Sequence, residues 1–118
     1  MGQITMSGID QGSVDASEVH KLSRALGLKT SQGKKALVHA MKCVQLLDRK
    51  QQDYGPNNIA YSGELGIAVR MQDKVCRLRH ILESKGEVQF EAKTDTYMDM
   101  TNYGIIGIML ENGEWEEK

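Results

Sequence analysis

The 118-residue chain has little of what several functional classes require. It has two cysteines, one proline and 5% aromatic residues, and its 15 Lys and Arg nearly balance its 16 Asp and Glu. Cys43 and Cys76 have no Cys or His at ligand spacing, and two thiols alone do not make a zinc site, so we interpret both as reduced core residues. A net charge of −1 supplies no broad positive field, so general coating of nucleic acid is not expected.

Long apolar runs are also missing. No stretch approaches the ~18 residues that span a bilayer, and residues 1–6 lack both the basic and the apolar part of a signal peptide. We therefore expect a cytoplasmic protein without a membrane partner, and at this length a single hydrophobic core.

Apolar residues at helical spacing predict four helices, over residues 17–27, 31–52, 65–84 and 92–110. Ser17 is the candidate N-cap of the first, Ser31 or Gly33 opens the second, and Gly27 and Asn112-Gly113 are stop signals. On the third, the predicted apolar stripe consists of Ile67, Met71, Val75, Leu78 and Leu82.

The predicted fold is all-α, a small antiparallel bundle of about four helices, because no strand is secure. Residues 1–16 are predicted to be a mobile arm and residues 17–112 the helical domain. Residues 53–62 are expected to form a loop, and residues 113–118 an acidic tail with Trp115 exposed.

Three acids recur every four residues on the fourth predicted helix. Glu91, Asp95 and Asp99 therefore stack on one side, and Asn102 and Ile106 continue the same stripe. Buried unpaired carboxylates are strongly unfavourable, so an inward-facing row predicts a bound cation, a Lys or Arg partner, or protonation. The alternative is a solvated first turn whose acids complement the helix dipole.

A mainly basic stripe lies beside the apolar one on the third predicted helix. Its members follow the spacing i, i+3, i+4 and i+7 and are Arg70, Asp73, Lys74 and Arg77. Arg and Lys at these positions can hold phosphate oxygens. Alternatively, Asp73 and Arg77 are a surface ion pair.

The junction after the second predicted helix joins a cation, an acid and an aromatic residue, in Lys50, Asp53 and Tyr54. Tyr54 can stack on a base, and Gly55 permits a positive φ or a close backbone approach. The alternative is an ordinary helix C-cap followed by a turn.

Together these segments resemble the phage-associated helical family called nucleotide modification associated domain 1, over about residues 47–110. The shared pattern reads Lys50-x-x-Asp53-Tyr54-Gly55, then Gly66-x-x-x-Arg70-x-x-Asp73-Lys74-x-x-Arg77-Leu78, then Glu91-x-x-x-Asp95-Thr96-x-x-Asp99-x-x-Asn102-Tyr103. The resemblance implies nucleotide binding or processing associated with nucleotide modification, in a bacterial host cell if a phage encodes the chain. It does not establish a reaction.

The acid row is also similar to the metal-binding helices of the all-α nucleoside triphosphate pyrophosphohydrolases. Those enzymes usually carry Glu-x-x-Glu on one helix and Glu-x-x-Asp on the next, whereas the acids here are four apart. The similarity implies Mg²⁺ as a cofactor, although a complete two-metal set is not present.

The leading hypothesis is a nucleotide-handling domain in which Glu91, Asp95 and Asp99 hold Mg²⁺ and act as catalytic residues. The remaining predicted site residues bind or orient the nucleotide and are Lys50, Asp53, Tyr54, Gly55, Arg70, Asp73, Lys74, Arg77, Asn102 and Tyr103. As an enzyme, the chain would hydrolyse a nucleotide phosphoanhydride. The alternatives are a non-catalytic module that binds a nucleotide or cyclic nucleotide, and a helical interaction adaptor; a homo-oligomer is possible in each case.

Overall fold

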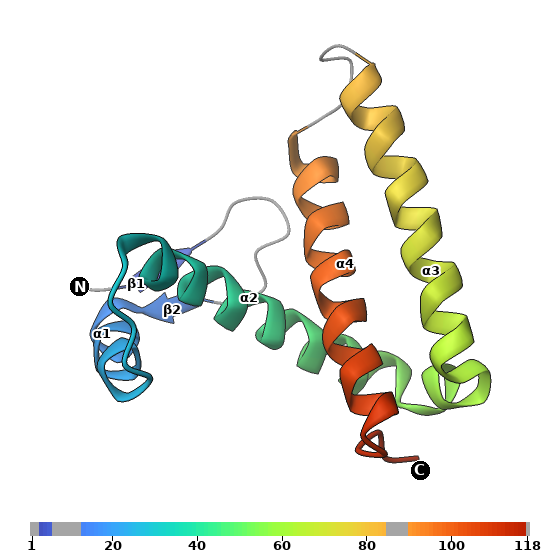
Figure 1. Ribbon diagram of the computed structural model, residues 1–118, viewed down its shortest axis with the longest axis horizontal. Helices are drawn as coiled ribbons and strands as arrows, with labels where there is room; N and C mark the ends of the chain where they lie inside the picture. The colour runs from blue at the N-terminus through green and yellow to red at the C-terminus, as the bar shows by residue number, and fades with distance from the viewer. Residues whose placement is uncertain (1–2, 6–12, 85–89, 118) are drawn as a thin grey trace. The chain divides into compact units, whose positions relative to one another are not determined.

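The computed structural model describes residues 3–5, 13–84 and 90–117, and it confirms the all-α prediction (Figure 1). The helices are α1 (Ala16–Ala25), α2 (Ser31–Tyr54), α3 (Asn57–Glu83) and α4 (Phe90–Glu111). Two compact units, Met1–Arg49 and Lys50–Lys118, divide the chain inside α2. Within the described ranges, no helix combines the length and apolarity needed to cross a membrane.

The first unit contains two short strands that the sequence did not predict. β1 (Gln3–Thr5) pairs antiparallel with β2 (Ser13–Asp15), with Ile4 opposite Val14, and Val14 is buried. Strands of three residues are too short to give a clear alternating pattern, so the sequence did not indicate them. The predicted mobility of residues 1–16 stays a prediction. Residues 1–2 and 6–12 of that arm lie outside the described part of the chain.

The ends of α1 are set by side-chain and backbone hydrogen bonds. Asp15, rather than the predicted Ser17, is the N-cap, and its carboxylate accepts hydrogen bonds from the backbone N–H and the hydroxyl of Ser17, each at 2.8 Å. At the other end, the N–H of Gly27 donates to the Arg24 carbonyl and that of Leu28 to the Ser23 carbonyl, which is a Schellman motif. The predicted stop at Gly27 is therefore confirmed.

The predicted start of α2 is also confirmed, with Thr30 as its cap. The Thr30 hydroxyl accepts a hydrogen bond from the N–H of Gly33 at 2.9 Å, which satisfies one of the unpaired donors of the first turn. α2 continues to Tyr54, two residues beyond the predicted end. Its C-terminal turn belongs to the second unit.

The predicted loop over residues 53–62 is much shorter in the structure. Gly55 and Pro56 alone separate α2 from α3, which begins at Asn57. Proline fits before a helix because the first helical residues need no backbone donor. Gly63 then kinks α3 with φ 61° and ψ −152°, a conformation open to glycine, so residues 57–62 form a separate helical turn.

α3 and α4 lie side by side and antiparallel in the second unit (Figure 1). Ile67 and Ile81 of α3 and Ile106 of α4 are buried, and a side chain added at Gly107 would lie 3.8 Å from Ile67. That distance is an ordinary van der Waals contact, so Gly107 lies opposite Ile67 at the interface between the two helices, and a Cβ there would be accommodated.

The face of α3 that contacts α4 coincides only in part with the predicted apolar stripe, of which Ile67 is buried. Val75 and Leu82 are 42% and 55% exposed, and Cys76, predicted to be a core residue, is exposed as well. The inner face instead repeats every seven residues through Ile67, Lys74 and Ile81. Because apolar residues occupy most sides of α3, their spacing alone does not indicate which side contacts another helix.

Within the second unit, the C-terminal segment is hydrogen-bonded to the junction between α2 and α3. The indole N–H of Trp115 donates to the Pro56 carbonyl at 3.0 Å, after α4 has ended in a Schellman motif with the N–H of Glu114 on the Met109 carbonyl. The prediction that Trp115 is exposed was therefore wrong, because the turn at Asn112-Gly113 directs the tail back to the junction between α2 and α3.

Candidate functional site

The central feature of the second unit is a carboxylate held by two lysines from different helices. Lys74 of α3 places its Nζ 2.9 Å from Oδ2 of Asp99, and Lys50 of α2 places its Nζ 3.0 Å from Oδ1. The structure thus brings together three predicted site residues that are 24 and 25 positions apart along the chain. We call this group the Asp99 cluster.

Within the Asp99 cluster, Asp99 and Lys74 are mostly shielded from water, whereas Lys50 is more exposed. The side chain of Asp99 is 15% exposed, that of Lys74 23% and that of Lys50 45%. Burial alone would raise the pKa of the Asp99 carboxyl, but hydrogen bonds and charge from Lys74 and Lys50 outweigh it and lower that pKa below the usual 3.8. Asp99 is therefore an anion at neutral pH, and both of its oxygens are engaged.

This environment predicts how stability depends on pH. Because the pKa of Asp99 is lower in the folded chain than in the unfolded chain, its contribution is fully present above about pH 4 and is lost as the pH falls through the folded-state pKa. Urea unfolding between pH 2 and 6, followed by circular dichroism, will show a loss of stability at the acidic end that is smaller in Asp99→Asn. Identical pH profiles for the two proteins would contradict this prediction.

Arg70 lies one helical turn before Lys74 on α3, on the side that faces α4. Its Nη1 atom is buried and has no hydrogen-bond partner among the described residues. A guanidinium donor that is removed from water and left unpaired is unfavourable, and it marks a position where an oxygen acceptor would be stabilising.

The other predicted residues surround this centre at different depths. Asn102 is buried one turn after Asp99, and Asp95 and Tyr103 are half-buried on α4. Asp73 and Arg77 are exposed on α3. Thr96, which belongs to the quoted pattern but was not among the predicted site residues, is 1% exposed beside Asp95, and its spacing alone did not distinguish it from a surface threonine.

The end of α2 presents Asp53 and Tyr54 to solvent, and Tyr54 is 70% exposed. Gly55 follows with φ 72°, and its N–H donates to the Gln51 carbonyl at 2.9 Å. This bond is the one expected of a glycine that caps a helix in the left-handed conformation. Gly55 therefore ends α2 one turn after Lys50.

The predicted Mg²⁺ site is only partly visible in the described residues. The side chain of Glu91 lies outside them, and no group of three His, Cys, Asp or Glu that could hold a metal is found among them. The two oxygens of Asp99 are taken by lysines, which a cation would have to displace. Mg²⁺ binding by Glu91, Asp95 and Asp99 stays a prediction, and the described donors do not by themselves fit it.

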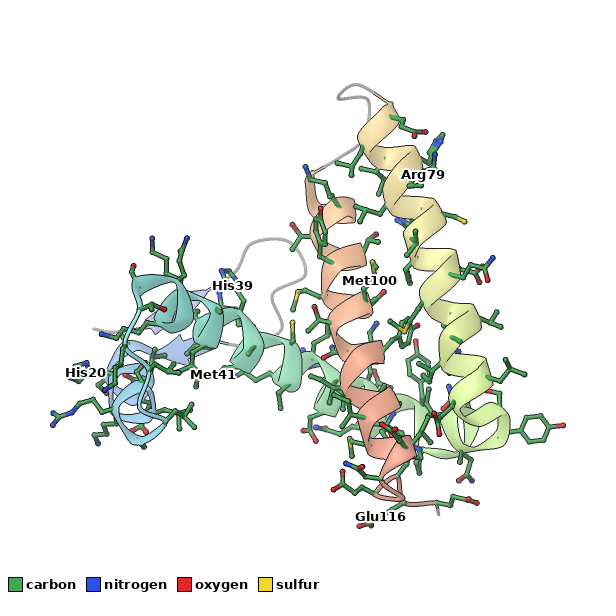
Figure 2. The ribbon with its side chains drawn as sticks, viewed as in Figure 1. His20, His39, Met41, Arg79, Met100 and Glu116 are labelled. Carbon is green, nitrogen blue, oxygen red and sulfur yellow. The ribbon has the colours of Figure 1, made fainter. Side chains whose placement is uncertain are left out.

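The first unit has an apolar hollow of about 350 Å³ on α2, lined by Leu37, Ala40, Met41, Val44 and Gln45. None of the predicted site residues lines it, and it has no charged group to hold a phosphate. His20 and His39 are exposed on α1 and α2 (Figure 2). The candidate site is therefore the Asp99 cluster with Arg70.

Comparison with protein-family models, with curated proteins and with solved structures finds no match to the chain. The resemblance to nucleotide modification associated domain 1 therefore stays a prediction based on the motifs quoted above. Function has to be argued from the chemistry of the site itself.

Proposed function

We propose that the second unit binds the phosphate groups of a nucleotide through Lys50, Arg70 and Lys74. The observation that carries the proposal is the buried, unpartnered Nη1 of Arg70, one turn from a lysine that already holds an anion. An arginine fork suits two oxygens of a phosphate, and lysines adapt to the remaining charge.

Asp99 supports the proposal as a resident anion. Lys50 and Lys74 reach it from two helices and bind one oxygen each, so the cluster is already arranged to hold two oxygens of one anionic group. Both lysine side chains are partly exposed and end in a mobile ammonium group. They can therefore turn from Asp99 to a ligand phosphate without a change in the helices.

The exposed Tyr54 offers a surface for the base. It lies one turn after Lys50 on α2, so a nucleotide with its phosphates at Lys50 has an aromatic ring within reach. Stacking on an aromatic ring is sequence-tolerant, because every base has a π-face. This arrangement provides nucleotide binding without strong selection among bases.

The proposal favours binding over hydrolysis. Hydrolysis by the predicted mechanism needs carboxylates free to hold Mg²⁺, and the oxygens of Asp99 are engaged by lysines. We therefore derive no hydrolytic step, and turnover in the presence of Mg²⁺ is one of the outcomes to be measured.

The test is a binding titration of the full chain with nucleoside mono-, di- and triphosphates, a nucleoside without phosphate, and inorganic phosphate, each with and without Mg²⁺. Thermal shift and calorimetry will detect a ligand, since one present at 100 times its Kd stabilises the fold by about 2.7 kcal/mol. We expect the nucleotides to bind, the bare nucleoside to fail, and binding to persist without Mg²⁺.

Arg70→Ala is expected to weaken nucleotide binding by roughly 10- to 100-fold, because it removes charge-assisted hydrogen bonds worth about 1.5–3 kcal/mol. Arg70→Lys, which keeps the charge and loses the fork, should fall in between. The matched control is Arg79→Ala, an arginine of the same helix whose side chain is 74% exposed. Equal effects of the Arg70 and Arg79 variants, or no binding of any nucleotide, would contradict this proposal and favour the alternative of a helical interaction adaptor.

A further inference from the structure

α3 has a second apolar face, which does not contact α4. Leu65, Val69, Val75 and Leu82 are 77%, 52%, 42% and 55% exposed, and Ala68 and Cys76 are exposed between them. We call these six residues the outer face of α3. A helix that is apolar on two sides is normally covered on both, and a contiguous exposed apolar patch marks an interaction surface.

The spacing of the outer face suits a helix as its partner. Leu65, Ala68, Val75 and Leu82 follow one another at steps of three and seven residues, so they line one side of the helix over about 26 Å at 1.5 Å per residue. The inner series Ile67, Lys74 and Ile81, of which both isoleucines are buried, lies on a different side. On one side the outer face borders the hairpin core, where Val75 and Leu82 lie next to the half-buried Met71 and Leu78, and from there it extends away from α4 to Leu65.

We propose that the outer face binds the outer face of a second copy of this chain, with the two α3 helices antiparallel about a twofold axis. The charges at its ends are self-complementary. Glu64 and Arg79 are both exposed and are equally far from the midpoint between residues 71 and 72, so an antiparallel pair places each Glu64 opposite the Arg79 of the other copy. A parallel pair would instead oppose like charges.

The antiparallel arrangement about this midpoint also pairs apolar residues of complementary size. Ala68 and Val75 are also equidistant from it, so the small side chain of one copy lies against the larger one of the other. Gln72 lies next to the axis, where the amides of the two copies can hydrogen-bond to each other. Arg79 lies toward the end of α3 that leads to α4 (Figure 2), and its present ion pair with Glu83 at 3.3 Å is exposed and weak.

The proposal is tested by sedimentation equilibrium of the full chain. The wild type is expected to sediment as a dimer, at twice the 13.2 kDa of one chain. Leu65→Glu and Val75→Glu each place two new carboxylates in the apolar interface, and each is expected to weaken dimerisation by roughly a hundredfold. Both residues are exposed in the single chain, so the helical circular dichroism should stay unchanged.

Ile108→Glu is the matched control, because Ile108 is a 60% exposed apolar residue of α4. It should leave the dimer intact. The orientation is tested by Arg79→Glu, which should weaken the dimer, and by the pair Arg79→Glu with Glu64→Arg, which should restore it. A monomeric wild type, a dimer lost equally in the Ile108 variant, or a charge-swapped pair that stays monomeric would each overturn the proposal.

Discussion

Asp99→Asn is expected to lower the stability of the chain and, at the same time, to raise its affinity for phosphate. Asn keeps the shape of Asp and one acceptor oxygen but removes the charge that Lys50 and Lys74 share. Losing hydrogen bonds between charged groups in a partly buried site lowers the free energy of unfolding by about 2 kcal/mol. The two lysines are then without their resident anion and bind an incoming phosphate more readily.

The rise in affinity follows from competition within the cluster. In the wild type, a phosphate has to displace Asp99 from both lysines, whereas in Asp99→Asn it replaces a weaker neutral contact. We expect nucleoside triphosphate affinity to increase by about tenfold, which corresponds to about 1.4 kcal/mol. Calorimetry at matched ionic strength measures this change, and urea unfolding of the same samples measures the stability.

Asp73→Asn is the control for this variant, because it removes one negative charge from an exposed position of α3. It should raise phosphate affinity little, since exposed charges are screened. If Asp99 is instead a ligand of a catalytic Mg²⁺, Asp99→Asn will abolish Mg²⁺-dependent hydrolysis and will not tighten binding in the absence of Mg²⁺. The sign of the affinity change therefore separates the two mechanisms.

The sequence predicts the helices of this fold well where local signals end them. The predicted signals Gly27 after α1 and Asn112-Gly113 after α4 both act through hydrogen bonds within a few residues. By contrast, residues 57–62 were predicted to be a loop because Pro56 and two asparagines suggest a turn. A single turn capped by Pro56 and kinked at Gly63 carries no periodic signal of its own.

Predicting the faces of the helices requires knowledge of their partners. On α4, the stripe through Asp99, Asn102 and Ile106 could be predicted, because polar and apolar residues there follow one line. On α3, the predicted stripe was correct for Ile67, which is buried, but wrong for Val75 and Leu82, which are exposed. Lys74 lies on the inner face with Ile67 and Ile81, and its partner Asp99 is 25 residues away in the sequence, so no local pattern can pair the two.

The same distinction applies to the candidate site. Residue types and spacing were sufficient to nominate Lys50, Lys74 and Asp99, whereas the choice between a cation bound by acids and an acid bound by lysines depends on three-dimensional contacts. The structure places lysines on both oxygens of Asp99. That contact is why nucleotide binding, and not metal-dependent hydrolysis, is the function proposed here.

The double replacement of Lys74 by Met and Asp99 by Leu is expected to preserve the fold while removing the site. Ile67 and Ile81 flank Lys74 along the inner face of α3, and Ile106 lies two turns after Asp99 on α4, so apolar replacements have apolar neighbours. Replacing a buried ion pair with hydrophobic residues of similar volume is often neutral or stabilising by about 1–4 kcal/mol. Lys50, which is 45% exposed, can turn to water.

Nucleotide binding should nevertheless fall by at least about a hundredfold in this double variant, because Lys74 is absent and Met offers no donor for a phosphate oxygen. Urea unfolding and calorimetry on the same preparation give both quantities. A marked loss of stability would mean that the Asp99 cluster holds α3 against α4, as a structural element of the hairpin. Retained stability with retained binding would instead place the phosphate away from Lys74. The expected combination is a stable fold that no longer binds nucleotide. It would indicate that the charges of Lys74 and Asp99 contribute to ligand binding and not to the stability of the hairpin.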